Sequence, residues 1–337
     1  MKAKQDKFWS MVSRYFDEYL PKVRRMSKGT VETYRYGLYS FGNYLEKILE
    51  IRPSHISFDS FNREKIKGYI SWMTKEAGLA VATSNLRISI IKSFLRFCSE
   101  EDIQYMPTYM AIATIPLQKS PQKMVEYMSE KALKIFLKQP NPNTMFGARD
   151  KMILIFMYDT ACRVQELVDV EVEDLNIEYD VPFVKLTGKG SKTRNVPLMN
   201  KTVEHLRHYL KNWQGKEKSL PLFYAKKDGS PMKLSTDAIS VLVKKYGQQG
   251  HLQCREVPER CYPHLLRKTR SMHLYMNGMP LEQVANFLGH ANSATINHYA
   301  KANTEMLRKS IEKANPEVVG QAKIWKEPHL LKRLCGL

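Results

Sequence analysis

Six polar side chains between positions 163 and 299 have the types that could together cut a phosphodiester. A tyrosine hydroxyl can act as the nucleophile, and imidazoles can move protons near neutral pH. Two guanidinium groups can bind phosphate oxygens bidentately and stay charged at any working pH. An ammonium can protonate the leaving oxygen. The candidate catalytic residues are Arg163, Lys189, His264, Arg267, His290 and Tyr299.

The leaving group sets the main chemical demand. A free tyrosine has a pKa near 10, so about one molecule in a thousand is ionised at pH 7. The expelled alkoxide is the harder problem, because alcohols and water have pKa values of roughly 15–16. A general acid on the leaving oxygen therefore matters more than a base on the tyrosine. The sequence has no Gly-x-x-x-x-Gly-Lys-Ser/Thr loop for a nucleotide. We expect no cofactor and no metal ion.

Each candidate stands where the sequence pattern changes. Arg163 lies where an apolar helical run meets the next helix. Lys189 lies in a Gly-Lys-Gly-Ser turn sequence between two short alternating segments, which predicts a β-hairpin. His264 opens a helix directly after a proline, while His290 and Tyr299 close a helical stretch.

The order and spacing of these residues resemble the tyrosine recombinase (lambda-integrase-like) family, which includes Xer-type recombinases and phage and transposon integrases. The family's Thr-Gly-x-Arg-x-x-Glu-Leu segment, Gly-Lys-Gly-x-Lys-x-Arg hairpin with Val-Pro-Leu, His-x-x-Arg pair, Leu-Gly-His segment and final Tyr all have counterparts. The match covers most of residues 130–305. The matching positions are Thr160, Arg163, Glu166, Leu167, residues 188–194 and 196–198, His264, Arg267, Leu288, Gly289, His290 and Tyr299.

The resemblance implies a role for each proton-carrying candidate. Tyr299 would be the nucleophile. Lys189 would deliver the leaving-group proton from a mobile hairpin. His264 would take or relay the tyrosine proton, and His290 would hydrogen-bond a non-bridging phosphate oxygen.

The resemblance also assigns the phosphate-binding groups and shows two departures. Arg163 and Arg267 would hold the phosphate. Glu166 lies three residues after Arg163 on the same helical face, so its carboxylate could orient an active-site histidine without touching substrate. Ala161 replaces the family's usual Gly, and Lys268 replaces a common second His. Neither position is catalytic, so we expect altered local geometry more than altered chemistry.

The same resemblance implies a site-specific recombinase that cleaves and religates DNA through a 3′-phosphotyrosine intermediate and a Holliday junction. Its partner would be double-stranded DNA with a specific recombination site. The protein would be a monomer or dimer when free and a homotetramer on DNA. It would be either an Xer-like resolvase or the integrase or transposase of a mobile element, and the divergent flanks of the motifs favour the latter.

The composition fits a polyanionic partner. Among 337 residues, 53 Lys and Arg stand against 34 Asp and Glu, which gives a net charge of +19. Such an excess favours nucleic acid because phosphate neutralisation releases counterions, although ribosomes or an anionic membrane surface would suit it too. No apolar run reaches about 18 residues, no signal-peptide pattern occurs, and the five cysteines are scattered. We expect a cytoplasmic, nucleoid-associated protein of a prokaryote or phage, without membrane association.

The sequence predicts a mainly α fold with a small β-sheet, in two domains. Helical spacing of apolar residues, with Pro21 as a stop, predicts a helical core-binding (SAM-like) DNA-binding domain over residues 1–106. Prolines then predict an extended linker over residues 107–127.

The catalytic domain is expected over residues 128–315, with a buried helix that includes residues 151–157. The tail over residues 316–337 combines apolar residues with lysines. By the resemblance, this tail would dock onto a neighbouring protomer.

Five basic residues are candidates for DNA contact. Three interleave with apolar residues in a predicted helix at residues 82–101, and two lie in the predicted hairpin. A merely solvated face would show the same pattern. The candidates are Arg87, Lys92, Arg96, Lys192 and Arg194.

Other interpretations use the same chain. A type IB topoisomerase would have nearly the same active site. Residues 279–290 resemble the start of a helix-turn-helix, as in a non-enzymatic DNA-binding regulator, but that leaves Arg163 and Lys189 without a purpose.

Two groups of residues raise the question of zinc. Cys254, Cys261 and His264, with His251 nearby, could bind it, but the six residues between the cysteines are unlike a usual zinc knuckle. A second pair, at positions 205 and 208, shares a helical face, and a solvated face is the simpler explanation of those histidines, His205 and His208.

Overall fold

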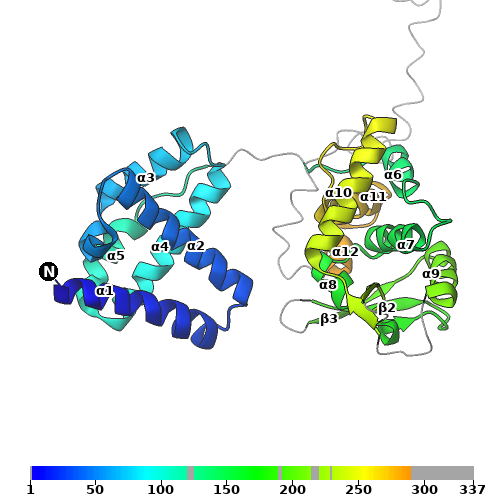
Figure 1. The fold of residues 1–337 in the computed structure, drawn as a ribbon, viewed down its shortest axis with the longest axis horizontal. Helices are drawn as coiled ribbons and strands as arrows, with labels where there is room; N and C mark the ends of the chain where they lie inside the picture. The colour runs from blue at the N-terminus through cyan, green and yellow to red at the C-terminus, as the bar shows by residue number, and fades with distance from the viewer. Residues whose placement is uncertain (1, 120–124, 189–191, 214–219, 228–229, 290–337) are drawn as a thin grey trace, which may run out of the picture. The chain divides into compact units, whose positions relative to one another are not determined.

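The computed structural model describes residues 2–119, 125–188, 192–213, 220–227 and 230–289 (Figure 1). The chain divides into two compact units, Met1–Gln122 and Lys123–Leu337. The described part is mostly helical, and its strands all lie in the second unit, which confirms the predicted fold class. Over these ranges, every helix is too short or too polar to cross a bilayer.

The first unit is a bundle of helices around a core rich in aromatic rings. Each helix turns its apolar stripe inward, which is why this segment folds as helices. Phe41, Tyr69 and Phe94 are fully buried, and the rings of Phe41 and Tyr69 lie 5.2 Å apart. The elements are α1 (Lys2–Arg14), the π-helix η1 (Tyr15–Val23), α2 (Lys28–Lys47), the short turns η2 (Pro53–His55) and η3 (Phe58–Ser60), α3 (Arg63–Lys75), α4 (Val81–Glu101), η4 (Ile103–Tyr105) and α5 (Met106–Ala113).

The prediction that Pro21 stops the first helix is wrong. The chain continues to Val23 as a π-helix, whose wider turn is shown by the 2.8 Å bond from the Arg24 amide to the Tyr19 carbonyl five residues earlier. Proline cannot donate to the usual α-helical acceptor, and the wider turn accommodates it. Tyr15 and Leu20 are fully buried in this stretch, so packing holds the segment helical.

The prediction of an extended linker starting at residue 107 is also wrong in its first part. Pro107 lies in the first turn of α5, where a missing amide costs no hydrogen bond. Ile112 and Ile115 are buried in the core of the first unit. Asn85 of α4 exchanges two hydrogen bonds with the backbone of Gln118, at 2.8 and 2.9 Å. Residues 106–118 therefore pack as part of the first unit.

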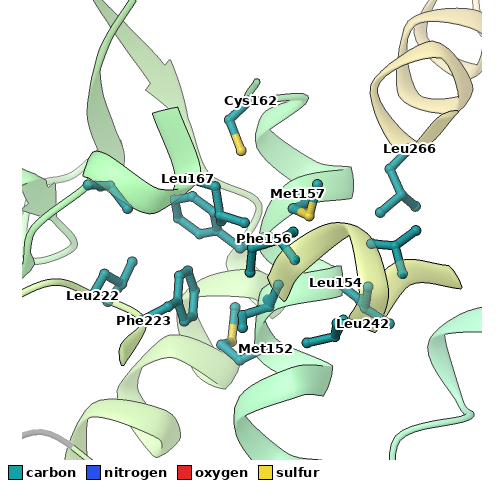
Figure 2. Close-up of a cluster of buried hydrophobic side chains, with 14 of the residues drawn as sticks. Met152, Leu154, Phe156, Met157, Cys162, Leu167, Leu222, Phe223, Leu242 and Leu266 are labelled. Atoms are coloured by element: carbon teal, nitrogen blue, oxygen red, sulfur yellow. The ribbon is translucent and has the colours of Figure 1, made fainter. Parts of the chain in front are cut away.

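The second unit is built around α7, which carries the predicted buried helix. Residues 152–154, Phe156 and Met157 are buried on several of its faces. Figure 2 shows Phe156 among side chains from α8, α10, α11 and the segment around Phe223. The elements are α6 (Glu130–Leu137), α7 (Met145–Thr160), α8 (Val164–Asp169), η5 (Val172–Asp174), β1 (Leu175–Asn176), β2 (Phe183–Thr187), β3 (Thr193–Pro197), α9 (Asn200–Trp213), β4 (Tyr224–Lys227), β5 (Ser230–Lys233), α10 (Thr236–Gln253), α11 (Pro263–Met276) and α12 (Leu281–Leu288).

The predicted hairpin is confirmed as β2 and β3, which pair antiparallel in a sheet of order β1-β2-β3. Val184 and Leu186 of β2 are buried, and the alternate residues Lys185 and Thr187 are exposed, as their alternation predicts. A second hairpin, β4 with β5, was not predicted. Its signal was the Asp-Gly pair at positions 228 and 229, a common two-residue hairpin turn.

Candidate active site

The turn between α7 and α8 presents the first candidate arginine. Thr160 is fully buried at the end of α7, and its hydroxyl accepts a 3.3 Å bond from the Cys162 amide. Ala161 adopts a left-handed conformation with φ of 47°, which ends α7 and reverses the chain. Arg163 then begins α8 in an extended conformation. Its side chain is 40% exposed, so this guanidinium is open to an anion.

The left-handed turn explains why Gly would be usual at position 161. An L-residue pays about 1–2 kcal/mol there because Cβ crowds the following carbonyl. In this chain the Ala161 methyl is fully buried against Val284 and Leu288 of α12. Burying a methyl group returns about 0.8 kcal/mol, which offsets much of that penalty.

Arg267, the second candidate, is almost entirely buried at 1% exposure. Its two terminal nitrogens each donate a 2.5 Å hydrogen bond, one to the Ala161 carbonyl and one to the Leu288 carbonyl. These carbonyls belong to helix ends, where backbone acceptors lack a helical partner and a cation is favoured. Burial, together with the nearby positive charge of Arg163, lowers the pKa of Arg267 to about 10, so it stays protonated at neutral pH.

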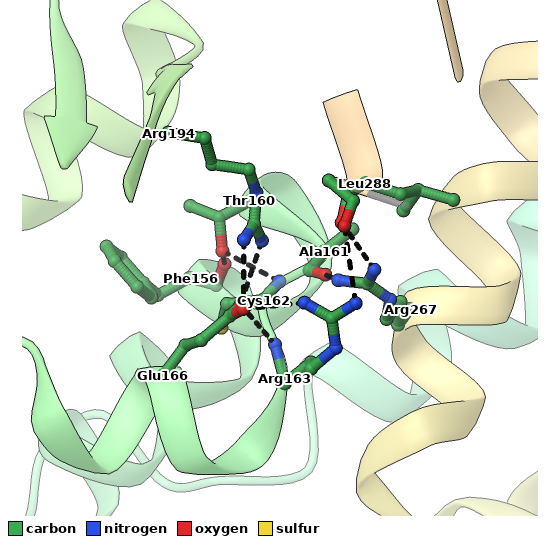
Figure 3. A network of polar contacts seen from close by, with 10 residues as sticks. Phe156, Thr160, Ala161, Cys162, Arg163, Glu166, Arg194, Arg267 and Leu288 are labelled. Carbon is green, nitrogen blue, oxygen red and sulfur yellow. Dashed lines mark hydrogen bonds and ion pairs between the residues drawn. The ribbon is translucent and has the colours of Figure 1, made fainter. Parts of the chain in front are cut away.

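Glu166 is the centre of the polar network in Figure 3. The carboxylate is 3% exposed and accepts a 2.8 Å bond from the Arg163 guanidinium and another from the Arg163 amide. Arg194 of β3 forks onto the same carboxylate with bonds of 2.9 and 2.8 Å. Burial alone would raise the pKa of Glu166, but the bonds from Arg194 and Arg163 outweigh it and hold the pKa at about 2.

Two glycines bring further segments against this network. A Cβ at Gly188, beside the hairpin turn, would lie 3.0 Å from Glu166 Oε1 and 3.7 Å from Arg163 Nη1. A Cβ at Gly289, which follows α12 with φ of 62°, would lie 2.9 Å from Arg194 Cδ. Both positions therefore allow a close approach that a larger residue would block.

His264 lies in the first turn of α11, three residues before Arg267, and its ring keeps access to solvent. Desolvation by the surrounding protein, with the positive charges of Arg267, Lys268 and Arg163, lowers its pKa. The neutral imidazole, which can accept a proton, is thus favoured at neutral pH. Lys268 turns instead to Tyr262, whose hydroxyl lies 3.1 Å from its ammonium.

The structure gives most of the predicted DNA contacts internal partners. Lys92 donates to the Ala113 and Ile115 carbonyls at 3.0 and 2.5 Å and so caps the end of α5. Arg96 of α4 bonds to Glu100 at 2.8 Å, and Arg87 lies over the Tyr36 ring at 5.4 Å from its centroid. Lys192 is exposed beside the hairpin turn.

The remaining catalytic candidates, Lys189, His290 and Tyr299, lie outside the described residues. Arg163, Glu166, Arg267 and His264 are brought to one region, as the motif spacing implies.

Two of the residues considered for zinc, His251 and Cys261, have other partners. His251 uses one ring nitrogen with the Val257 carbonyl at 2.6 Å and the other with Arg255 at 2.9 Å. Cys261 donates to the Pro258 carbonyl. Within the described ranges, no three or more His, Cys, Asp or Glu side chains gather as a metal site.

Sequence reasoning missed the role of Arg194, although a signal was present. Arg194 pairs with Leu186 across the hairpin, and directly opposed residues share a face of the sheet. Leu186 is buried, as is Val196 two residues after Arg194. The alternation therefore indicates that Arg194 faces inward.

Replacing Glu166 with Gln should remove an acid-sensitive part of the stability. Because the folded pKa of about 2 lies below the ordinary 4.5, the charged carboxylate contributes about 3 kcal/mol above pH 4.5. This contribution is lost as the pH falls towards 2. We expect the unfolding free energies of the wild type and E166Q, measured with urea at several pH values, to converge over that range. Two curves that stay parallel would contradict this assignment.

Comparison with known proteins gives a consistent result. Residues 126–306 match the phage integrase family, and residues 14–102 match the phage integrase N-terminal SAM-like domain. The chain is 30% identical over 314 residues to tyrosine recombinase XerA of Pyrococcus horikoshii, covering 93% of this chain and 97% of that protein.

Solved structures share the fold. The XerH recombinase bound to palindromic difH in a post-cleavage complex has a TM-score of 0.64 at 20% identity, covering 94% of this chain and 85% of that one. A lambda integrase tetramer bound to a Holliday junction has a TM-score of 0.63 at 14% identity, with 86% and 76% covered. With the matching family model and the XerA similarity, the chain belongs to the phage integrase family of tyrosine recombinases, enzymes that cut and rejoin DNA.

Proposed function

We propose that this recombinase acts on a specific site in double-stranded DNA through a covalent 3′-phosphotyrosine intermediate on Tyr299. The observation that carries the proposal is that Arg163, which the buried carboxylate of Glu166 holds, lies close enough to Arg267 and His264 for their charges to interact. Three positive or proton-accepting groups in one place suit a phosphate whose negative charge grows in the transition state.

The reaction would be a transesterification with balanced bonds. The Tyr299 oxygen bonds to phosphorus while the bond from phosphorus to the 5′ oxygen breaks. The tyrosine proton passes to His264, and Lys189 protonates the 5′ oxygen as it leaves. The phosphotyrosine keeps the energy of the phosphodiester, so a DNA hydroxyl can reverse the step.

The two arginines would divide the work on the phosphate. Arg163 is half-exposed and has N–H groups left after its bond to Glu166 and a long bond of 3.5 Å to the Gly289 carbonyl, so it can present donors to phosphate oxygens. Arg267 is fixed by two carbonyls and supplies a positive charge in a water-poor position. His290 would hydrogen-bond a non-bridging oxygen.

The glycines that precede Lys189 and His290 in the sequence support the roles given to these two residues. Gly188 lies against Glu166 and Arg163, and Gly289 lies against Arg194. Both glycines therefore border the polar network.

For the whole protein we propose an Xer-like or mobile-element recombinase in the cytoplasm, with the first unit as DNA-binding domain and the second as catalytic domain. Strand exchange would pass through a Holliday junction in a homotetramer. The net charge of +19 and the similarity to a lambda integrase tetramer on such a junction support this assembly. The tail at residues 316–337 would dock onto a neighbouring protomer, and Lys192 remains a candidate phosphate contact.

Tyr299→Phe should abolish the covalent adduct, because the nucleophilic oxygen is absent. DNA binding should stay within about twofold, since binding rests mainly on phosphate contacts. A nicked suicide substrate followed by denaturing gel electrophoresis detects the adduct. Tyr179→Phe, at an exposed tyrosine, is the matched control and should form adduct normally. Adduct formation by Y299F would disprove the assigned nucleophile.

Lys189→Ala should slow cleavage by about 10²–10⁴-fold, the usual contribution of a general acid. A substrate with sulfur at the 5′ bridging position should restore most of the rate, because a thiolate leaves without protonation. Arg163→Lys should be slow on both substrates, since an ammonium cannot reproduce the fork. Single-turnover cleavage measures both. A K189A variant that is equally slow on the sulfur substrate would remove Lys189 from the acid role.

Deleting residues 317–337 should prevent assembly on paired sites and leave binding to a single site. Apolar residues of the tail, such as Trp325 and Leu330, would no longer reach the next protomer. Analytical ultracentrifugation with DNA gives the assembly state, and a recombination assay gives the function. The docking role is wrong if the truncated protein still synapses and recombines.

A further inference from the structure

Arg194 was a candidate DNA contact, but its side chain is directed into the protein. Its side chain is 14% exposed, and both terminal nitrogens are bonded to the buried carboxylate of Glu166. To reach a phosphate, Arg194 would have to leave this bidentate ion pair, and the buried carboxylate of Glu166 would lose one of its two arginine partners. Breaking a buried pair by removing one partner is strongly destabilising, because the remaining charge is left uncompensated. The side chain is thus committed inside the protein.

The hairpin register links this ion pair to the turn that carries Lys189. Thr187 pairs with Thr193, and the Gly188 amide donates a 2.8 Å bond to the Lys192 carbonyl. Arg194 follows Thr193 along β3 and pairs with Leu186 of β2. The last two described pairs before the turn are therefore one and two positions along the ladder from the pair that contains Arg194.

The other end of the ion pair leads to the phosphate-binding arginine. Glu166 accepts from both the amide and the guanidinium of Arg163 at 2.8 Å. One carboxylate thus joins β3 to the start of α8 (Figure 3). Gly289 also packs against Arg194, because a Cβ at this position would lie only 2.9 Å from Arg194 Cδ.

We propose that Arg194 is a positioning residue that fixes the hairpin bearing Lys189 against the helix bearing Arg163. This inference rests on the proposed function, in which Lys189 is the general acid. Arg194 itself touches neither DNA nor the reacting atoms. Arginine suits the task because its planar fork satisfies both carboxylate oxygens at once, which fixes direction as well as distance.

The first test compares Arg194→Ala on normal and 5′-bridging sulfur substrates. A misplacement of about 1 Å can cost about 10²-fold in rate, so we expect a loss of about 10–100-fold on the oxygen substrate. The sulfur substrate should recover most of it, since no proton is then required. The double variant R194A/K189A should cleave the oxygen substrate no more slowly than K189A alone, because Arg194 acts through Lys189.

The second test separates positioning from phosphate contact. A lysine or arginine that binds a phosphate contributes about one unit to the slope of log affinity against log salt. R194A should leave this slope unchanged. Lys192→Ala is the matched control in the same hairpin: as an exposed candidate contact, it should lower the slope and show no gain from the sulfur substrate.

Arg194→Lys guards against a simple folding failure of R194A. It keeps the positive charge beside Glu166 and loses the fork, so we expect a smaller rate loss with the same recovery on sulfur. Thermal unfolding of each variant gives the folded fraction. Equal losses on both substrates, or a reduced salt slope, would overturn the positioning role. If K189A is also not recovered by sulfur, the proposed function fails instead, and the two failures are distinguishable.

Discussion

One buried carboxylate organises the candidate active site. Glu166 is surrounded by Arg163 and Arg194, with the charge of Arg267 also felt nearby. Three guanidinium groups against one carboxylate leave a local excess of positive charge. The pKa of Arg267 is lowered by burial and by repulsion from the positive charges of Arg163 and Arg194. A bound phosphate would relieve that repulsion, and a phosphate gaining charge would relieve it further, which is the preorganisation that electrostatic catalysis requires.

The arrangement depends on helix ends more than on helix faces. Arg267 is held by the terminal carbonyls at Ala161 and Leu288, and Arg163 starts a new helix two residues after the left-handed turn. Carbonyls at helix ends are free to accept because no helical amide reaches them. The core beneath, in which Phe156 of α7 and Leu167 of α8 are both buried, fixes α7 and α8 to each other. Packing therefore sets the positions of charges that would otherwise repel.

Sequence patterns predicted those parts of the site that depend on local periodicity. Helical spacing found α7, the proline before His264 marked the start of α11, and alternation with turn residues found β2 and β3. The pattern failed where packing overrides a local signal. Pro21 lies inside a π-helix because buried rings hold it there, and Pro107 lies in the first turn of α5 instead of starting a linker. A proline marks a missing donor, and only the surrounding structure decides whether that donor was needed.

Net charge alone does not identify the basic residues that contact DNA. The chain has 19 more basic than acidic residues, yet Lys92 caps a helix and Arg194 holds a buried carboxylate. A basic side chain that leaves water must replace its lost hydration with hydrogen bonds to acceptors. Buried or half-buried cations find these acceptors inside the fold, whereas the ammonium of an exposed lysine such as Lys192 binds water or an external anion. Burial of the side chain, read together with its acceptor, therefore separates the cations that build the site from those left for a nucleic acid.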